Sequence, residues 1–199
     1  MGPLILFAHG AGLPSSHPWM QGWVARLSRL GTVVTFDYDY MAAPGKRPPD
    51  RMPKLLARHR RALDEARAAH PGVPVVLAGK SMGSRVGCTL SVEPDVHVAG
   101  LICFGYPLVG MNGKRRDEVL RSLTAPILFI QGTRDRLCPL DVLDEVRPCM
   151  SVRSELHVVD SGDHSLNARK RDLKAAGRTQ DDVDDDIEAA AAAFIQSLS

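Results

Sequence analysis

Residues 75 to 83 read Val-Val-Leu-Ala-Gly-Lys-Ser-Met-Gly, an apolar run that leads directly into the pattern G-x-S-x-G. The run before Gly79 predicts a buried strand, and residues 84–90 suit a helix. A serine on a tight turn between a strand and a helix projects its hydroxyl away from the backbone, and flanking glycines let neighbouring chain approach closely. The stretch therefore predicts that Ser81 is an exposed nucleophile at the edge of a sheet.

A second interpretation of these residues is a phosphate-binding loop, because Gly79-Lys80-Ser81 matches the end of G-x-x-x-x-G-K-[ST]. That motif requires a glycine five positions before Gly79, where the sequence has Pro74. The nucleotide-binding interpretation is therefore disfavoured. Since a pattern as short as G-x-S-x-G arises by chance in about one chain in ten of this composition, the surrounding sequence has to support it.

The composition is that of a globular protein. Of the 199 residues, 44% are hydrophobic and 24% are charged, and the net charge is +2. We therefore expect one domain over residues 1–199. Basic residues are scattered over 58–67 and 114–116 without interleaved aromatic residues, which disfavours nucleic acid as a partner.

No segment reaches the length of a membrane span, and the apolar run 4–8 is too short for the core of a signal peptide. The four cysteines lack C-x-x-C spacing, which is typical of reduced thiols. We expect a cytoplasmic protein without a membrane partner, and the sequence leaves its oligomeric state open.

Apolar runs alternate with helical segments along the chain. We expect strands over 4–8, 32–36, 73–78, 98–104, 127–130 and 155–159, and helices over 19–30, 52–70, 81–90 and 140–146. Most of the runs are continuously apolar, which is typical of strands buried on both faces. The pattern predicts a three-layer α/β/α sandwich around a mostly parallel sheet of about six strands.

The end of the chain predicts one more helix. Over residues 182–198, apolar side chains recur at helical spacing on one face: Val183, Ile187, Ala191, Phe194 and Leu198. The acidic run 181–188 is interpreted as a complement to the helix dipole and as solvated surface, not as a metal site. Residues 166–180 are expected to form an exposed connection with some helix.

A serine nucleophile needs a base within hydrogen-bond reach and a carboxylate that orients the base. In a parallel sheet these groups are expected in loops after later strands. Asp135 follows the predicted strand 127–130, and His164 follows the strand 155–159. The order Ser, Asp, His differs from that of chymotrypsin and subtilisin and is the one expected for an α/β-hydrolase.

Other interpretations of these residues stay open. Asp135 can also serve as a local turn cap, and Asp163 is a rival orienting carboxylate, although adjacent side chains in a turn usually diverge. His157 is expected to pack within a strand. The remaining histidines, His17, His59, His70 and His97, are expected on helices or loops away from the strand ends.

The developing oxyanion needs two backbone N–H donors. One is expected from Met82, directly after the nucleophile. The other is expected from the exit of the first strand, His9-Gly10-Ala11-Gly12, with Ala11 preferred and Gly12 as the alternate. His9 is then expected to be structural.

Four motifs resemble those of the α/β-hydrolase superfamily: HGAG at 9–12, GKSMG at 79–83, GTRDRLCP at 132–139 and SGDHSL at 161–166. More narrowly, HGAG, the FDYDYM segment that ends in GKRPPD, GKSMGSR, GYPL and GDHSL resemble small bacterial hydrolases related to dienelactone hydrolases and to a testis-expressed hydrolase-like family. Members that resemble a chromatin-complex subunit share these motifs, and a scaffold role is open to them. The fold alone therefore does not decide activity.

Because the HGAG strand comes almost directly at the start of the sequence, we expect a sheet of about six strands without the leading antiparallel hairpin of larger superfamily members. The interval 104–125 is too short for a separate lid and allows one short helix. An open cleft for small or extended soluble substrates is expected.

Some side chains are candidates for substrate contacts. Lys80 could join Lys46, Arg47 and Arg85 in an electropositive rim suited to an anionic acyl group. Three side chains are candidates for the pocket wall, although core packing explains them equally well: Tyr38, Tyr40 and Met41. Tyr106 is a further candidate for a substrate contact.

The sequence thus predicts a serine hydrolase, a carboxylesterase that needs neither metal nor cofactor and binds a small-molecule ester. The predicted catalytic residues are Ser81, Asp135 and His164. Cleavage of thioesters or amides by the same residues, and a non-catalytic scaffold of the same fold, remain as alternatives.

Overall fold

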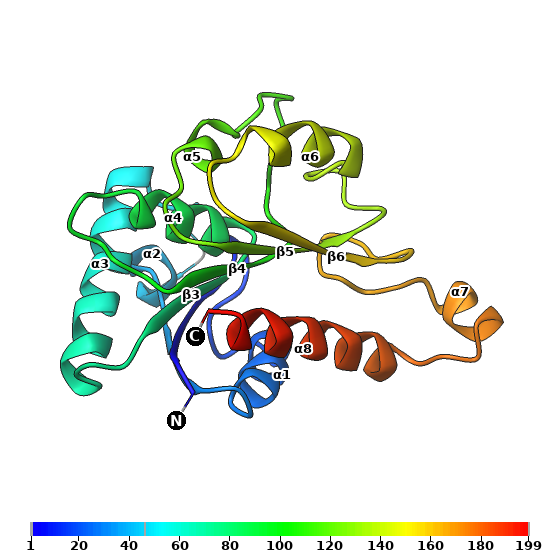
Figure 1. The fold of residues 1–199 in the computed structure, drawn as a ribbon, viewed down its shortest axis with the longest axis horizontal. Helices are drawn as coiled ribbons and strands as arrows, with labels where there is room; N and C mark the ends of the chain where they lie inside the picture. The colour runs from blue at the N-terminus through cyan, green and yellow to red at the C-terminus, as the bar shows by residue number, and fades with distance from the viewer. Residues whose placement is uncertain (1, 46, 199) are drawn as a thin grey trace.

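The computed structural model describes residues 2–45 and 47–198, and a single six-stranded sheet organises them (Figure 1). Its neighbours follow the order β2-β1-β3-β4-β5-β6, and every pair is parallel. The strands are β1 (Leu4–Ala8), β2 (Thr32–Phe36), β3 (Val75–Lys80), β4 (Gly100–Phe104), β5 (Ile127–Gly132) and β6 (Ser154–Val159). The predicted parallel α/β sheet is confirmed.

The longer helices are close to where the sequence predicts them: α1 (Pro18–Leu27), α3 (Met52–Ala69), α4 (Met82–Ser91), α6 (Leu140–Val146) and α8 (Gln180–Gln196). Three short helices were not predicted individually: α2 (Asp39–Ala42), α5 (Glu118–Arg121) and α7 (Lys170–Ala175). The helix α5 lies in the interval where the sequence allows only one short helix. A helix of about one turn lacks the repeated apolar spacing that identifies longer ones.

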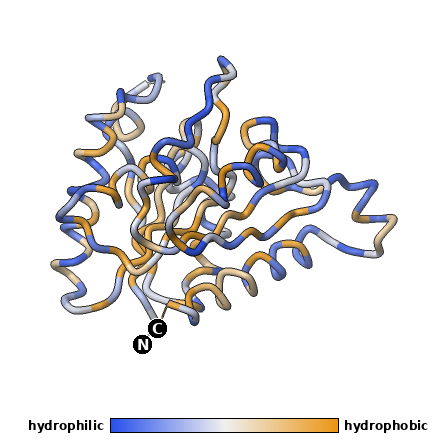
Figure 2. Tube along the Cα trace, turned by 45° about the horizontal axis from the view of Figure 1, so that its top comes forward, coloured by the Kyte–Doolittle hydropathy of each residue, from blue (hydrophilic) through white to orange (hydrophobic). Residues whose placement is uncertain are grey.

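Helices cover both faces of the sheet, with α1 and α8 on one face and α3, α4 and α6 on the other (Figure 1). Successive residues of each strand point to opposite faces. In β1, Ile5 and Phe7 belong to the core under α1 and α8, whereas Leu4, Leu6 and Ala8 belong to the core under α3 and α4. The four central strands β1, β3, β4 and β5 are buried along their whole length, and orange, hydrophobic segments run through the middle of the trace in Figure 2. Burial on both faces explains their continuous apolar sequences.

The last helix buries the apolar face that its spacing predicts, with Val183, Ile187, Ala191 and Phe194 in the core. Most of its acidic residues are exposed, as expected, and some of them also pair with an arginine of α1. Arg26 of α1 donates to Asp185 at 2.5 Å and to Glu188 at 3.0 Å. The acidic run therefore also fastens α8 to α1, a contact between segments far apart in sequence.

The order of the strands reverses at β1, because β2 lies next to β1 on one side and β3 lies next to β1 on the other. The loops that leave β1 and β3 at their carboxyl ends therefore separate to opposite sides, and ligand sites in open α/β sheets form at such a crevice. No helix in the described residues is both long and apolar enough to cross a bilayer.

Candidate active site

The carboxyl ends of the parallel strands bring the predicted functional residues to one edge of the sheet. Ser81 directly follows β3, Asp135 lies three residues after the end of β5, and His164 lies five residues after the end of β6. The loop 9–12 leaves the adjacent strand β1. Four loops from separate parts of the chain thus meet at this edge.

Ser81 has the strained backbone of a sharp strand-to-helix turn, with φ 50° and ψ −112°. Such a conformation costs a non-glycine residue on the order of 1–3 kcal/mol and persists only where the surrounding structure enforces it. Two glycines make the turn sterically possible. A Cβ at Gly79 would collide with the Ser84 amide, and one at Gly83 would collide with the Ala8 carbonyl.

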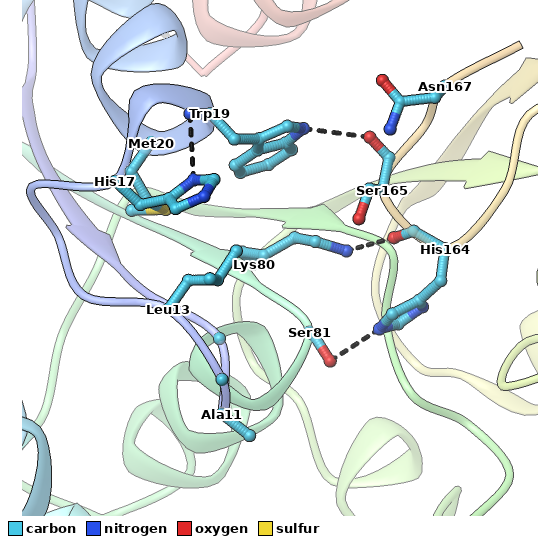
Figure 3. Close-up of a pocket in the computed structure, with 12 residues that line it drawn as sticks. Ala11, Leu13, His17, Trp19, Met20, Lys80, Ser81, His164, Ser165 and Asn167 are labelled. Atoms are coloured by element: carbon cyan, nitrogen blue, oxygen red, sulfur yellow. Dashed lines mark hydrogen bonds between the residues drawn. The ribbon is translucent and has the colours of Figure 1, made fainter. Parts of the chain in front are cut away.

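The three predicted side chains form one hydrogen-bonded network. Ser81 Oγ lies 2.8 Å from His164 Nε2, and His164 Nδ1 lies 2.8 Å from Asp135 Oδ2. A carboxylate can only accept, so Nδ1 carries the imidazole proton and Nε2 is free to accept from the serine hydroxyl. Figure 3 shows the Ser81 hydroxyl pointing at the imidazole.

The structure distinguishes the two candidate carboxylates. Asp135 is 3% exposed, and its second oxygen accepts the Leu137 amide at 2.9 Å, so it caps its own turn while it contacts His164. Asp163 instead accepts the Ser165 and Asn167 amides at 2.8 and 3.0 Å. Asp135 is therefore the partner of the imidazole, and Asp163 shapes the loop that carries it.

The loop that carries His164 is held from outside by two side chains. Trp19 Nε1 donates to the Ser165 carbonyl at 3.0 Å, and Lys80 Nζ donates to the His164 carbonyl (Figure 3). Within the loop, Ser161 and Leu166 adopt positive φ angles of 50° and 65°. The loop that positions the imidazole therefore contains two non-glycine residues with positive φ, a conformation that such residues rarely adopt.

Lys80 is a buried cation at this site. Burial lowers the pKa of its ammonium group to about 8, although Asp135 and Asp163 oppose the shift. Its Nζ also lies 5.5 Å from the centroid of the Trp19 ring, which stabilises the charged form. The prediction that Lys80 faces the site is in agreement with its position on the cavity wall.

The loop after β1 is fixed by a neutral imidazole. His9 is fully buried, its Nδ1 donates to the Gly10 carbonyl at 2.6 Å, and its Nε2 accepts the Tyr38 amide at 3.1 Å. Burial lowers the pKa of His9, which preserves this neutral form. Tyr40 Oη donates to the Ala11 carbonyl at 2.9 Å. His9 therefore has the structural role that the sequence suggests.

The residues whose amides the sequence proposes as oxyanion donors lie next to Ser81 or on the cavity wall. Met82 is the first residue of α4, and Ala11 and Gly12 border the same cavity as Ser81. A Cβ at Gly10 would lie 3.6 Å from Ser81 Cβ, which shows how closely this loop passes the serine. Within 2–45 and 47–198, the Met82 and Ala11 amides have no hydrogen-bond acceptor.

A cavity of about 440 Å³ opens beside Ser81 and His164. The other residues of its wall come from the loop after β1, from α1, from the end of β3 and from the His164 loop: Gly10, Ala11, Gly12, Leu13, His17, Trp19, Met20, Lys80, Ser165 and Asn167. Apolar side chains of α1 and its leading loop form one side (Figure 3).

The sequence interpretation missed part of this wall and misplaced other residues. The sequence places His17 away from the strand ends, but it is the N-cap of α1, and the start of this helix borders the cavity. Trp19 was missed for the same reason. Tyr40 and Tyr106 do not line the cavity: both are buried, and Tyr106 Oη donates to the Arg116 carbonyl at 3.3 Å. The core-packing alternative is correct for Tyr40, and the expected place of Tyr106 on the cavity wall is wrong, because its ring is buried in the core.

The predicted electropositive rim is not formed as a unit. Among the members of that group that the structure describes, only Lys80 lines the cavity. Arg47 is exposed, Arg85 lies in a different pocket, and Lys46 lies outside the described residues. Across the described ranges, no three His, Cys, Asp or Glu side chains converge in a way that could hold a metal ion.

Solved structures with this fold include hydrolases at low sequence identity. Est1E from Butyrivibrio proteoclasticus with bound ferulic acid is 14% identical, with a TM-score of 0.72 over 98% of this chain and 89% of that one. Esterase 2 from Thermogutta terrifontis, phosphoramylated by tabun, is 19% identical, with a TM-score of 0.70 over 100% of this chain and 84% of that one. An alpha-beta serine hydrolase homologue from Coxiella burnetii is 17% identical, with a TM-score of 0.70 over 87% and 82%.

At such identities the likeness shows the shared fold alone. The family comparison goes further, because the model of the alpha/beta hydrolase domain matches residues 2–196, nearly the whole sequence. The match agrees with the six-stranded parallel sheet and with the motifs that surround its carboxyl edge. The chain therefore belongs to the alpha/beta hydrolase domain family.

Proposed function

We propose that this protein is a serine hydrolase that cleaves carboxylic esters of small substrates through an acyl-enzyme intermediate. One observation carries the proposal: the Ser81–His164–Asp135 network, with both hydrogen bonds at 2.8 Å, borders a cavity. A serine with a hydrogen-bonded imidazole and a buried carboxylate behind it is the arrangement that activates a hydroxyl nucleophile.

In the first step Ser81 Oγ attacks the ester carbonyl carbon, and His164 Nε2 takes the hydroxyl proton. The imidazole becomes positively charged, and the adjacent Asp135 carboxylate stabilises that charge. Because Asp135 also holds the proton on Nδ1, the imidazole keeps the tautomer that can act as a base. The Leu137 amide holds the carboxylate in this orientation.

The carbonyl oxygen becomes negatively charged in the tetrahedral intermediate. We assign its stabilisation to the Met82 and Ala11 amides, with Gly12 as the alternate donor. One such donor lowers the barrier by about 2.7–4 kcal/mol. The bonds from His9 to Gly10 and from Tyr40 to Ala11 support this assignment, because they fix the loop before substrate arrives.

Collapse of the intermediate breaks the ester bond, and His164 gives its proton to the departing alkoxide. Water then attacks the acyl-enzyme with His164 again as the base, which releases the acid and restores Ser81. A cavity of about 440 Å³ lined by Leu13, Trp19 and Met20 suits a small acyl or alcohol group with an apolar part. The Est1E and Thermogutta structures are consistent with ester chemistry on this fold.

The proposal is tested by covalent labelling. A fluorophosphonate should modify the wild-type protein once per chain, and peptide mapping should find the adduct on Ser81. Ser81→Ala, the matched control, should stay unlabelled while it keeps its circular dichroism spectrum. A folded wild-type protein that remains unlabelled after prolonged exposure would refute the proposal and favour a scaffold.

A substrate panel then separates esters from the alternatives that share the first chemical step. Short p-nitrophenyl esters, acyl-CoA thioesters and peptide amides are compared by kcat/KM on the same preparation. We expect the esters to be the best substrates. A higher kcat/KM for thioesters or amides would contradict the carboxylesterase assignment while it retained the serine mechanism.

A further inference from the structure

Most arginines of this protein bind a carboxylate or a carbonyl, as Arg26 binds Asp185 and Glu188. Over residues 2–45 and 47–198, a few arginine side chains have no hydrogen-bond or ion-pair partner: Arg47, Arg51, Arg85, Arg116, Arg136 and Arg169. Four of these are exposed to solvent, and only Arg85 and Arg116 are half-buried. These two guanidinium groups have thus lost hydration without gaining a counter-charge.

The two arginines line one pocket of about 340 Å³, which shares no residue with the cavity at Ser81. The pocket lies between the start of α3, the helix α4 and the segment 112–119. Lys114 and Arg115 add positive charge at its border, and Arg115 is engaged by Glu145 at 3.0 Å. Glu118 is the acidic residue of the wall.

The positive charges of Arg85 and Arg116 repel each other. Burial and the positive charge of Arg116 both lower the pKa of Arg85. The protein nevertheless holds the pair in place. The Arg116 amide donates to the Leu108 carbonyl at 2.8 Å, and a Cβ at Gly110 would come within 2.9 Å of the Arg116 Nη2 atom, so glycine leaves room for that guanidinium.

We infer that this pocket is a second binding site, which takes an anionic group with two or more terminal oxygens, a carboxylate or a phosphate. Each guanidinium presents a planar fork of N–H donors that matches such oxygens, and half-burial strengthens the interaction. An anion between Arg85 and Arg116 would supply the counter-charge that both arginines lack in the protein. The anion site itself does not depend on the proposed function, whereas a substrate as the source of the anion rests on it.

The pocket is linked to Ser81 through α4, because the Arg85 amide donates to the Ser81 carbonyl at 3.2 Å. Arginine side chains on a helix extend toward its N-terminus. The anion can therefore be either a free ligand or the charged end of a substrate whose reacting group lies at Ser81. Both sources share the same chemistry at the arginines.

Calorimetric titration with inorganic phosphate and with succinate, in a zwitterionic buffer at low salt, tests the site. We expect Arg85→Gln and Arg116→Gln each to weaken binding at least about tenfold, because each removes a charged donor. Arg171→Gln, the same charge change at an exposed position on α7, should bind as the wild type does. Absence of binding to the wild type at millimolar concentrations, or equal binding by all three variants, would overturn the inference.

Thermal unfolding without ligand provides an independent readout. Since Arg85 and Arg116 repel each other, we expect either glutamine variant to have a Tm at or above that of the wild type. A marked fall in Tm in both variants would show that the guanidinium groups serve packing instead, contrary to the inference.

Kinetics then distinguish the two sources of the anion. Neutral p-nitrophenyl esters are compared with hemiesters whose acyl chain ends in a carboxylate. A KM advantage for the hemiester that Arg116→Gln removes would support a substrate-borne anion. Phosphate binding without such an advantage would support a free ligand at the same site.

Discussion

Two pairs of an imidazole and a hydroxyl lie in this protein with similar geometry and opposite surroundings. Ser81 Oγ is 2.8 Å from His164, and Tyr38 Oη is 3.1 Å from His59. The second nitrogen of His164 contacts the Asp135 carboxylate. The second nitrogen of His59 is buried and has no hydrogen-bond partner among the described residues.

The two imidazoles also differ in their exposure to solvent. The His164 side chain is 31% exposed and borders the cavity, whereas His59 is fully buried between α3 and the sheet. Burial, with the charge of Arg58, lowers the pKa of His59 to about 3, so this imidazole stays neutral. A hydroxyl beside an imidazole therefore indicates catalysis only where a carboxylate and an opening to substrate accompany it.

Removing each hydroxyl in turn tests this contrast most strongly. Ser81→Ala should lower kcat for a p-nitrophenyl ester by on the order of a million-fold, because no other group can form the acyl-enzyme. Tyr38→Phe should change kcat little and lower the free energy of unfolding by about 1 kcal/mol. Esterase activity in Ser81→Ala comparable to that of the wild type would contradict the assignment of Ser81 as the nucleophile.

The carboxylate behind His164 is the next element to test. Asp135→Asn should lower kcat by about ten-thousand-fold, because an amide no longer holds the proton on Nδ1. Asp163→Asn is the matched control, since Asp163 contacts loop amides and not the imidazole. A larger loss of kcat in the control than in Asp135→Asn would make Asp163 the orienting carboxylate.

A substitution at Lys80 tests how strongly kcat depends on the position of the His164 loop. Lys80→Met keeps the aliphatic stem and removes the amine that donates to the His164 carbonyl. We expect kcat to fall about tenfold, because small displacements of a base are costly. Lys54→Met, an exposed control on α3, should leave kcat unchanged. An unchanged kcat in Lys80→Met would remove this amine from the positioning of the base.

The buried pair predicts a pH effect on stability. The pKa of His59 is about 3 in the folded protein and about 6.5 when unfolded, so the unfolded chain binds more protons between these values. Stability should therefore fall as the pH decreases from 6.5 toward 3, with His59 contributing up to about 1.4 kcal/mol per pH unit.

Urea unfolding at several pH values measures this contribution as the difference between the wild type and His59→Phe. The variant keeps an aromatic ring beside Phe36 but cannot titrate. Its free energy of unfolding should decline less steeply with falling pH. Parallel declines in the two proteins would show that other groups cause the acid sensitivity.

The smallest expected effect concerns the loop after β1. Tyr40→Phe removes the bond to the Ala11 carbonyl and should lower kcat about threefold through a less ordered oxyanion loop. Activity on a neutral ester at saturation is the measurement. A complete loss of activity would mean that Tyr40 contacts substrate after all.

Much of the candidate site was predictable, because the G-x-S-x-G turn and the loops that follow parallel strands can be recognised in short stretches of sequence. Ser81, Asp135 and His164 each follow a strand that the apolar runs identify. The positions of Tyr40 and Tyr106 were not predictable, since a tyrosine near a motif serves the cavity or the core depending on where its side chain turns. Trp19 and His17 line the cavity only because the start of α1 lies beside the carboxyl edge of the sheet.

The linear pattern of this chain determined its class of fold and which loops carry reactive groups, because burial on both faces of parallel strands requires unbroken apolar runs. Only the tertiary structure decided that Asp135 rather than Asp163 hydrogen-bonds to the His164 imidazole. It also decided that the His59 side chain is fully buried while that of His164 is partly exposed. The physical reason is that hydrogen-bond partners and solvent access depend on the three-dimensional approach of segments that are distant along the chain.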